Sequence, residues 1–181
     1  MDMMNKSIEI FQKGFDLLPS SEVVDRKESA ALFEKMGFPT SKMEKWQKSK
    51  IRKVLKNDFS FEHRSVAEND NISFPKPDFE TLHQFNFANG ILSGDKPLQK
   101  NSDGSIFGSL KAAMSEFPDL VNKHLNQYLK EDLNGFNALN NSLFADGFFM
   151  YLPKNCILEQ AVYVMNKQNG NGGAFVNSRN L

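Results

Sequence analysis

The sequence predicts an α+β chain in which a helical N-terminal part with a small β-hairpin is followed by short strands that open a larger sheet. Three observations favour this fold class. Apolar residues recur at helical spacing through the first third, an Asn89-Gly90 pair lies between alternating apolar residues, and apolar β-branched or aromatic segments follow Asp146-Gly147. We expect a mainly helical domain over residues 1–135 and the beginning of a second, incomplete domain over residues 136–181.

Three helical stretches are expected in the first third of the chain. The first covers residues 6–18. The second begins at an N-cap on Ser20-Ser21 and ends at Gly37, because glycine is favoured just after the last helical turn. The third begins at a cap on Thr40 or Ser41 and runs to Lys56.

In the middle of the chain, the sequence predicts a β-hairpin and a short strand, with irregular connecting segments around them. Residues 57–78 lose their periodicity and read as a surface connection. Residues 83–92 carry the hairpin signal, and the stretch from Gly94 to Gly104 reads as a loop. A short strand is then expected at Ile106 and Phe107.

Helices return before the final strands. Ser109 is the expected N-cap of a helix over residues 110–116, and Pro118 the first residue of another, whose apolar stripe runs to Leu129. A third helix is expected over residues 136–143. Two strands follow, separated by a turn at 153–155.

These last strands have no partners in the chain that follows them. An unpaired strand edge is an aggregation hazard that natural proteins avoid. We therefore expect the 181 residues to be the front part of a longer protein, and we expect the exposed edge after Tyr151 to cause self-association or a disordered tail.

Composition limits the classes of partner. Lys+Arg 22 balances Asp+Glu 22, which gives a net charge of zero and no general attraction to nucleic acid or anionic membrane. No apolar run is long enough to span a bilayer, and the N-terminus lacks a secretory signal. The one cysteine, Cys156, cannot form an internal disulfide, which is consistent with a cytoplasmic protein.

The residues with reactive side chains do not form a recognisable site. His63, His83 and His124 have no second ligand at metal spacing, so we interpret them as surface or half-buried histidines. Cys156 lies next to Ile157 and has no neighbouring base, so a packing role is expected.

Other candidate features also favour structural roles. The run from Asn169 to Gly173 lacks the lysine and hydroxyl of a phosphate loop, and Glu131-Asp132 does not place two carboxylates in one cleft. Trp46 is expected to anchor a helix to its domain. The prediction is therefore that this segment has no catalytic, cofactor-binding or metal-binding residue.

Three phrases, in order, resemble the N-terminal portion of the SufD family within the SufB/SufD superfamily. The first is GFPTSKMEKW at Gly37–Trp46, and the second is FANG at Phe87–Gly90. The third is FNALN from Phe136, followed by Asp146-Gly147, YLPK from Tyr151 and Leu158-Glu159. The phrase that begins at Gly37 favours SufD over its paralogue SufB, which is less expected to carry it.

This resemblance implies a non-catalytic scaffold subunit of the SUF iron–sulfur cluster assembly system, cytoplasmic, whose C-terminal part begins a right-handed parallel β-helix. The implied partners are SufB-like and SufC-like (ATPase) subunits, bound through regions mostly absent here. The cluster would be handled by the full complex and not by this segment.

Two other classes stay open at this stage. One is a β-solenoid carbohydrate-active enzyme whose catalytic groove lies beyond residue 181, and the other is a free-standing adaptor domain. A SufB paralogue fragment is the alternative within the family.

Overall fold

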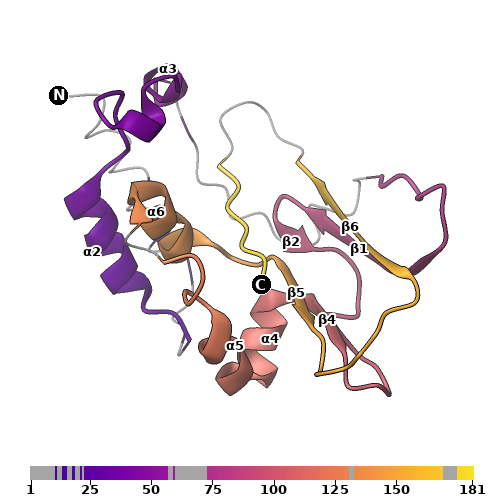
Figure 1. The fold of residues 1–181 in the computed structure, drawn as a ribbon. Coiled ribbons are helices and arrows are strands. Elements are labelled where there is room, and N and C mark those ends of the chain that lie inside the picture. Colours follow the sequence, from indigo (N-terminus) through magenta and orange to yellow (C-terminus); the bar gives the residue numbers. More distant parts are fainter. Residues whose placement is uncertain are drawn as a thin grey trace. The chain divides into compact units, whose positions relative to one another are not determined.

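A computed structural model gives the fold of the chain (Figure 1). The residues it describes are Phe11, Gly14, Phe15, Leu18, Ser21, 23–56, Phe59, 73–130, 133–168 and 175–181. They divide into two compact units. The first draws on Met1–His63, His124–Leu143 and Gly170–Phe175, and the second on Arg64–Lys123, Phe144–Asn169 and Val176–Leu181. The domain boundary expected after residue 135 stays a prediction.

Helix α2 (Arg26–Met36) begins later than predicted and ends where predicted. The Asp25 side chain accepts a hydrogen bond from the Glu28 N–H (2.9 Å), and an Asp with a Glu three residues on is a helix-start signature. The Ser21 hydroxyl instead accepts from Val23 N–H (3.1 Å) in a turn before the helix. The predicted cap at Ser20-Ser21 was therefore wrong, while Gly37, with φ 63°, ends the helix as expected.

The helical turns expected between Thr40 and Lys56 are present as two short elements, η1 (Glu44–Trp46) and α3 (Ile51–Val54). Neither turn has a side-chain cap. The Ser49 hydroxyl bonds the Trp46 carbonyl (2.7 Å), and such local side-chain bonds compete with a continuous helix. The helix expected over residues 6–18 lies mostly outside the described residues.

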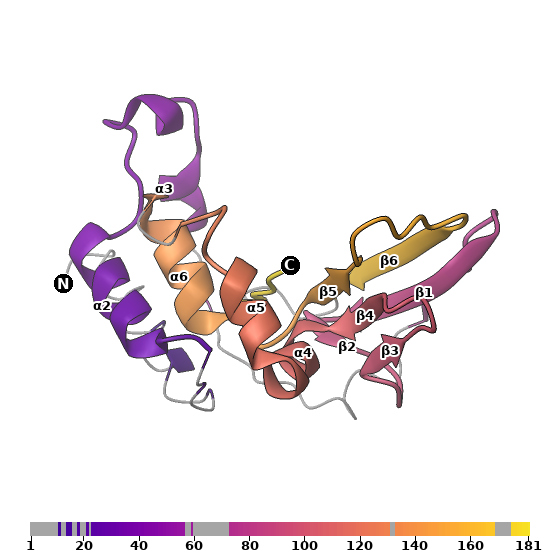
Figure 2. The same ribbon diagram turned by 60° about the horizontal axis from the view of Figure 1, so that its bottom comes forward.

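Helix α6 (Gly135–Leu143) confirms the helix predicted from Phe136 and packs against α2 (Figures 1 and 2). The two helices approach closely because Gly135 has no side chain: a Cβ there would overlap the carbonyl oxygen of Gly37. Six buried residues form the core of this unit: Phe11, Phe33, Phe38, Ala138, Leu139 and Leu143.

The second unit contains two three-stranded sheets. In the first, β1 (Thr81–Ala88) pairs antiparallel with β2 (Ile91–Leu92) and parallel with β6 (Ala161–Lys167). Asn89 and Gly90 both take positive φ (50° and 81°), as a tight hairpin turn requires, so the predicted hairpin is confirmed.

The second sheet has the order β3 (Leu98–Lys100), β4 (Ile106–Ser109), β5 (Phe148–Tyr151), with antiparallel pairs throughout. The predicted strand at Ile106 is confirmed. The prediction of a loop from Gly94 to Gly104 was partly wrong, because this stretch contains the strand β3. Three residues are too few to show a period, and β3 is identified only by its pairing with β4.

Apolar side chains of the two sheets form one core. Its buried members are Phe85, Phe87, Leu92 and Phe107, with partly buried residues packed against them, among them Phe148, Met150, Leu158, Val162 and Val164. Helix α4 (Leu110–Glu116) begins at the predicted cap, where the Ser109 hydroxyl accepts from Ala112 N–H (3.0 Å). Helix α5 (Pro118–His124) begins as predicted but ends earlier, because Asn126 takes φ 60°.

The strands after Asp146-Gly147 are confirmed, but the expectation that they lack partners was wrong. β5 pairs with β4, and β6 lies beside β1 (Figure 1). Both partners come from much earlier in the sequence, where local periodicity gives no sign of the pairing. The mixed α+β class is therefore confirmed, and neither sheet closes on itself.

Candidate functional site

Two of the three histidines, His83 and His124, lie among the described residues. His83 lies on β1 with its ring against Phe107 (5.4 Å between ring centroids), and its Nε2 is buried without a hydrogen-bond partner. His124 ends α5, and its Nδ1 lies 2.7 Å from the Tyr128 hydroxyl. His63 lies outside the described residues. Within the described ranges, His, Cys, Asp and Glu form no group of three that could hold a metal ion.

Cys156 is in a setting that suppresses thiolate formation. Its Sγ–H donates to Asp103 Oδ2 at 3.4 Å. Desolvation, then the hydrogen bond to Asp103 and its charge, raise the pKa of the Cys156 thiol. Hydrogen bonds from the Ser105 hydroxyl and N–H lower the pKa of Asp103, so the carboxylate stays charged beside the thiol. A nucleophilic cysteine needs the opposite shift.

Of the other candidates, Trp46 packs within the first unit, and the rest lie outside the residues that the structure describes. The Trp46 ring packs against Phe136 within the first unit, at 5.5 Å between centroids, which fits the anchoring role predicted for it. Glu131-Asp132 and the run from Asn169 to Gly173 lie outside the described residues. Of the described helices, none has the length and hydrophobicity to cross a membrane.

Asp146, interpreted from the sequence as part of a turn, connects three elements of the second unit through its side chain. Its side chain is buried and accepts three hydrogen bonds: from Ser109 Oγ–H (2.8 Å), Lys111 N–H (3.0 Å) and Leu92 N–H (3.2 Å). These donors come from the end of β4, the start of α4 and β2. We call these four residues the Asp146 joint. A buried carboxylate is stable only when it is hydrogen bonded in this way.

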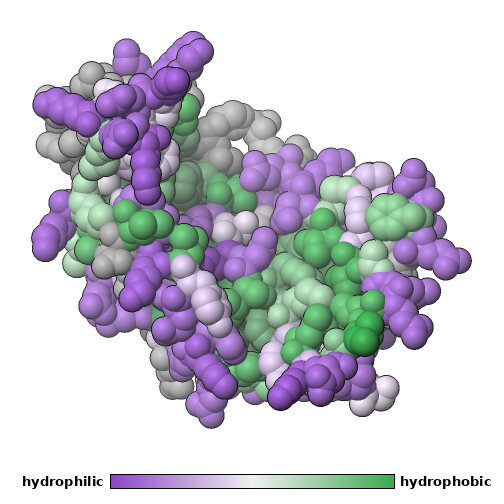
Figure 3. Space-filling view, in the orientation of Figure 1, coloured by the Kyte–Doolittle hydropathy of each residue, from purple (hydrophilic) through white to green (hydrophobic). Residues whose placement is uncertain are grey.

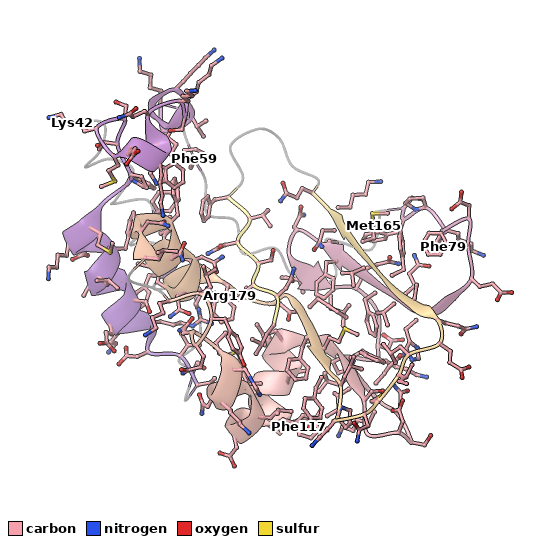
Figure 4. The ribbon with its side chains drawn as sticks, in the orientation of Figure 1. Lys42, Phe59, Phe79, Phe117, Met165 and Arg179 are labelled. Carbon is pink, nitrogen blue, oxygen red and sulfur yellow. The ribbon has the colours of Figure 1, made fainter. Side chains whose placement is uncertain are left out.

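The residues at 178–181 add to the sheet beside β5. Arg179 N–H donates to Asp146 O (3.1 Å), Leu181 N–H to Phe148 O (2.9 Å), and Met150 N–H to Leu181 O (2.9 Å), in a parallel arrangement. Gly147 permits this approach, because a Cβ there would overlap the carbonyl oxygen of Arg179. Figure 4 labels Arg179 on this stretch.

The chain thus passes from β5 in one sheet to β6 in the other, and back to residues 178–181 beside β5. Each return places a strand parallel to an earlier one: β6 beside β1, and 178–181 beside 146–150. Among the described residues, β6 has a partner on one side only. The edge of β6 and the partly buried apolar residues packed against the core, among them Val162 and Val164, are therefore the features of this part of the described chain.

These features define a mixed α+β chain whose last two extended segments, β6 and residues 178–181, each lie parallel to an earlier one. The chain belongs to the SufBD family: residues 1–164 match the family model described as the SufBD protein N-terminal region. This match confirms the family resemblance found in the three sequence phrases.

Curated relatives agree with the family. The chain is 34% identical over 93 residues to the iron-sulfur cluster assembly SufBD family protein ABCI9 of Arabidopsis thaliana, covering 50% of this chain and 19% of the relative. It is 41% identical over 75 residues to a SufBD family protein of Synechocystis sp., covering 40% and 15%. With the chloroplastic ABCI8 of Arabidopsis thaliana it shares 45% identity over 60 residues, covering 33% and 10%. The matched regions are thus less than a fifth of each relative's length.

Proposed function

We propose that this chain is the N-terminal part of a SufD-type scaffold subunit in iron–sulfur cluster assembly. Membership of the SufBD family, with relatives named for cluster assembly, is the observation that carries this proposal. The phrase GFPTSKMEKW from Gly37 favours the SufD type over the SufB type. The role is non-catalytic, and the protein is cytoplasmic.

We further propose that residues 136–181 begin a right-handed parallel β-helix, while residues 1–135 form the domain that precedes it. The parallel additions of β6 to β1 and of 178–181 to 146–150 support this proposal, because a β-helix grows by stacking parallel strands in each of its sheets. Parallel strands connected within one sheet almost always follow a right-handed path.

The proposed partners are a SufB-like subunit and a SufC-like ATPase, contacted mainly through parts of the protein beyond this segment. The cluster is cargo of the whole complex, and this segment holds none of its ligands.

Affinity purification of the protein, tagged at its own chromosomal locus, tests the proposal. We expect a SufB-like protein and an ATPase subunit to be recovered in amounts comparable to the tagged protein. A tagged cytoplasmic protein of similar abundance is the control. Recovery of neither subunit above this control would contradict the proposed role.

A second experiment separates the segment from the complex. The 181-residue chain is incubated anaerobically with ferrous iron and sulfide, and its visible absorption is recorded. We expect no bands of a protein-bound cluster after desalting. Such bands, lost in the Cys156→Ser variant, would show that the segment itself holds a cluster ligand.

A further inference from the structure

Positive charge is concentrated in one stretch of the first unit, residues 42–56, which we call the basic segment. It carries seven of the chain's 22 Lys and Arg residues and only one of its 22 Asp and Glu residues, Glu44, so its net charge is +6. The other fifteen basic and twenty-one acidic residues leave a net charge of −6 on the rest of the chain. The overall balance of zero therefore conceals a strongly basic surface.

Local hydrogen bonds and apolar anchors hold the basic segment in a defined conformation. Trp46 N–H donates to Met43 O (2.9 Å), and Leu55 N–H donates to Ile51 O (2.9 Å). The Trp46 ring packs against Phe136, and Leu55 packs against the core of the first unit. The segment is therefore attached to its unit by apolar side chains, and its charged side chains are presented on a fixed backbone.

The lysines of the basic segment all lie in solvent. They are Lys42, Lys45, Lys48, Lys50, Lys53 and Lys56. Among the described residues, no ion pair joins any of them to a carboxylate. On α3, Lys53 and Val54 follow Lys50 by one turn, on the side away from Leu55. Figure 3 shows hydrophilic side chains projecting where η1 and α3 lie in Figure 1, and Figure 4 labels Lys42.

Two apolar side chains are exposed among these lysines. Met43 is 48% exposed and Val54 is 53% exposed. Single exposed apolar residues are common on protein surfaces. Here, however, both stand beside lysines that have no carboxylate partner, which matches the make-up of an interface with apolar contacts inside a charged rim.

We propose that the basic segment binds an acidic protein partner, through a surface on which Asp and Glu side chains surround apolar ones. The carboxylates of the partner pair with the exposed lysines, and its apolar side chains cover Met43 and Val54. Charge complementarity of this kind steers association and selects the partner, and it weakens as salt screens the charges.

Two observations favour a protein over other polyanions. Single-stranded nucleic acids are bound by aromatic rings that stack on bases, whereas the ring of Trp46, the one Trp of the chain, packs against Phe136. Helices that lie on membranes insert an apolar face, whereas Leu55 packs into the core of its own unit. The net charge of −6 on the rest of the chain also opposes binding to an extended anionic surface.

Photocross-linking from within the basic segment tests the proposal in cells. In the full-length protein, the exposed and uncharged Gln47 is replaced by p-benzoylphenylalanine, and Gln127, exposed in the same unit, is the matched control site. We expect a cross-linked protein at Gln47 that is about tenfold or more weaker at Gln127, with the contact mapped by mass spectrometry to a surface rich in Asp and Glu. No specific product at Gln47, or a contact surface that is not acidic, would overturn the proposal.

Charge reversal measures what the lysines contribute. The cross-linked partner is purified, and its Kd for the full-length protein is measured at about 0.05 and 0.3 M NaCl. The test variant combines Lys45→Glu, Lys48→Glu and Lys53→Glu. The control makes the same charge change at exposed lysines elsewhere, Lys27→Glu, Lys96→Glu and Lys154→Glu. We expect the Kd to rise about tenfold or more in the test variant and less than about twofold in the control, with a smaller salt effect in the test variant. Equal changes in the two variants would overturn the proposal.

Two further probes distinguish the class of partner. The same variants are tested with vesicles of phosphatidylglycerol and phosphatidylcholine, and with a single-stranded DNA oligonucleotide. Binding of either probe that is lost only in the test variant would overturn the proposal in favour of a membrane or a nucleic acid. Substitutions at exposed positions should leave the thermal unfolding of both variants close to that of the unsubstituted protein. The SufB-like and SufC-like subunits should co-purify equally with the test variant, so this proposal and the scaffold role can fail separately.

Discussion

The hydroxyl of Ser109 has two functions at once: it donates to Asp146 Oδ1 at 2.8 Å and accepts from the N–H of Ala112 at 3.0 Å. It therefore caps α4 and connects the start of that helix to the carboxylate of Asp146, two residues before β5. The Asp146 joint depends on this residue, and its strength can be measured.

Replacing Ser109 with alanine should lower the free energy of unfolding by about 1–3 kcal/mol, since it removes a helix cap and a hydrogen bond to a charged group. Urea denaturation followed by circular dichroism measures the change. Ser109→Thr keeps the hydroxyl and should cost clearly less. Equal losses in the two variants would show that the hydroxyl does not stabilise the joint.

Gly147→Ala should detach residues 178–181 from β5, because its Cβ would overlap the carbonyl oxygen of Arg179. Hydrogen exchange at the Arg179 and Leu181 amides, which donate to Asp146 O and Phe148 O, should become faster. Gly94→Ala is the matched control: its φ is 104°, but no atom lies within 4 Å of its Cβ. Unchanged exchange in Gly147→Ala would contradict the close approach.

Gly37 and Gly135 lie in contact. Replacing either one with alanine should lower the stability of the fold, for different reasons and by different amounts. Gly37→Ala meets no atom within 4 Å but must keep φ 63° and ψ −170°, a backbone region essentially restricted to glycine, which costs about 1–3 kcal/mol. Gly135→Ala forces its Cβ into the Gly37 carbonyl and should separate α2 from α6, with a larger loss of stability. Thermal unfolding of the two variants measures the difference, and a smaller loss in Gly135→Ala would contradict the packing.

Asp103→Asn should make Cys156 more reactive. The Asp103 hydrogen bond and charge both raise the thiol pKa, so their loss lowers it and increases the thiolate fraction below pH 9. Alkylation by iodoacetamide at pH 8 should become faster than in the unsubstituted chain. Asp95→Asn, an equal charge change at an exposed aspartate, is the control and should leave the rate unchanged.

The pH dependence of stability around Asp103 has a definite sign. Its pKa is lower in the folded chain than the ordinary 3.8, so the folded state favours the charged form. This contribution is present above pH 3.8 and is lost as the pH falls through the folded value. Ser105→Ala removes the largest cause of the shift and should reduce this acid-side loss in a pH series of urea denaturation curves.

Local signals in the sequence predicted local structure well. The cap at Ser109, the turn at Asn89-Gly90 and the helix end at Gly37 each depend on residues a few positions apart, and the structure confirms all three. The start of α2 was missed because Ser21 and Asp25 both offer capping oxygens, and only the structure shows which one caps the helix.

Long-range relationships could not be predicted in this way. The three donors to Asp146 come from Leu92, Ser109 and Lys111, more than thirty positions earlier in the chain. The parallel pairing of β1 with β6 has no signature within either strand. Sequence reasoning therefore identified these strands correctly but assigned them no partners.

The pairing of β1 with β6 also determines when the first sheet can be completed during synthesis. β6 leaves the ribosome about 80 residues after β1, a delay of roughly 4–16 s at ordinary rates of translation. Until then Phe85 and Phe87 can pack against Leu92 of β2 and Phe107 of β4, but they lack the cover of Val162 and Val164 from β6. A nascent chain of this protein must therefore pass through an interval of exposure in which chaperones and competing chains have access to β1.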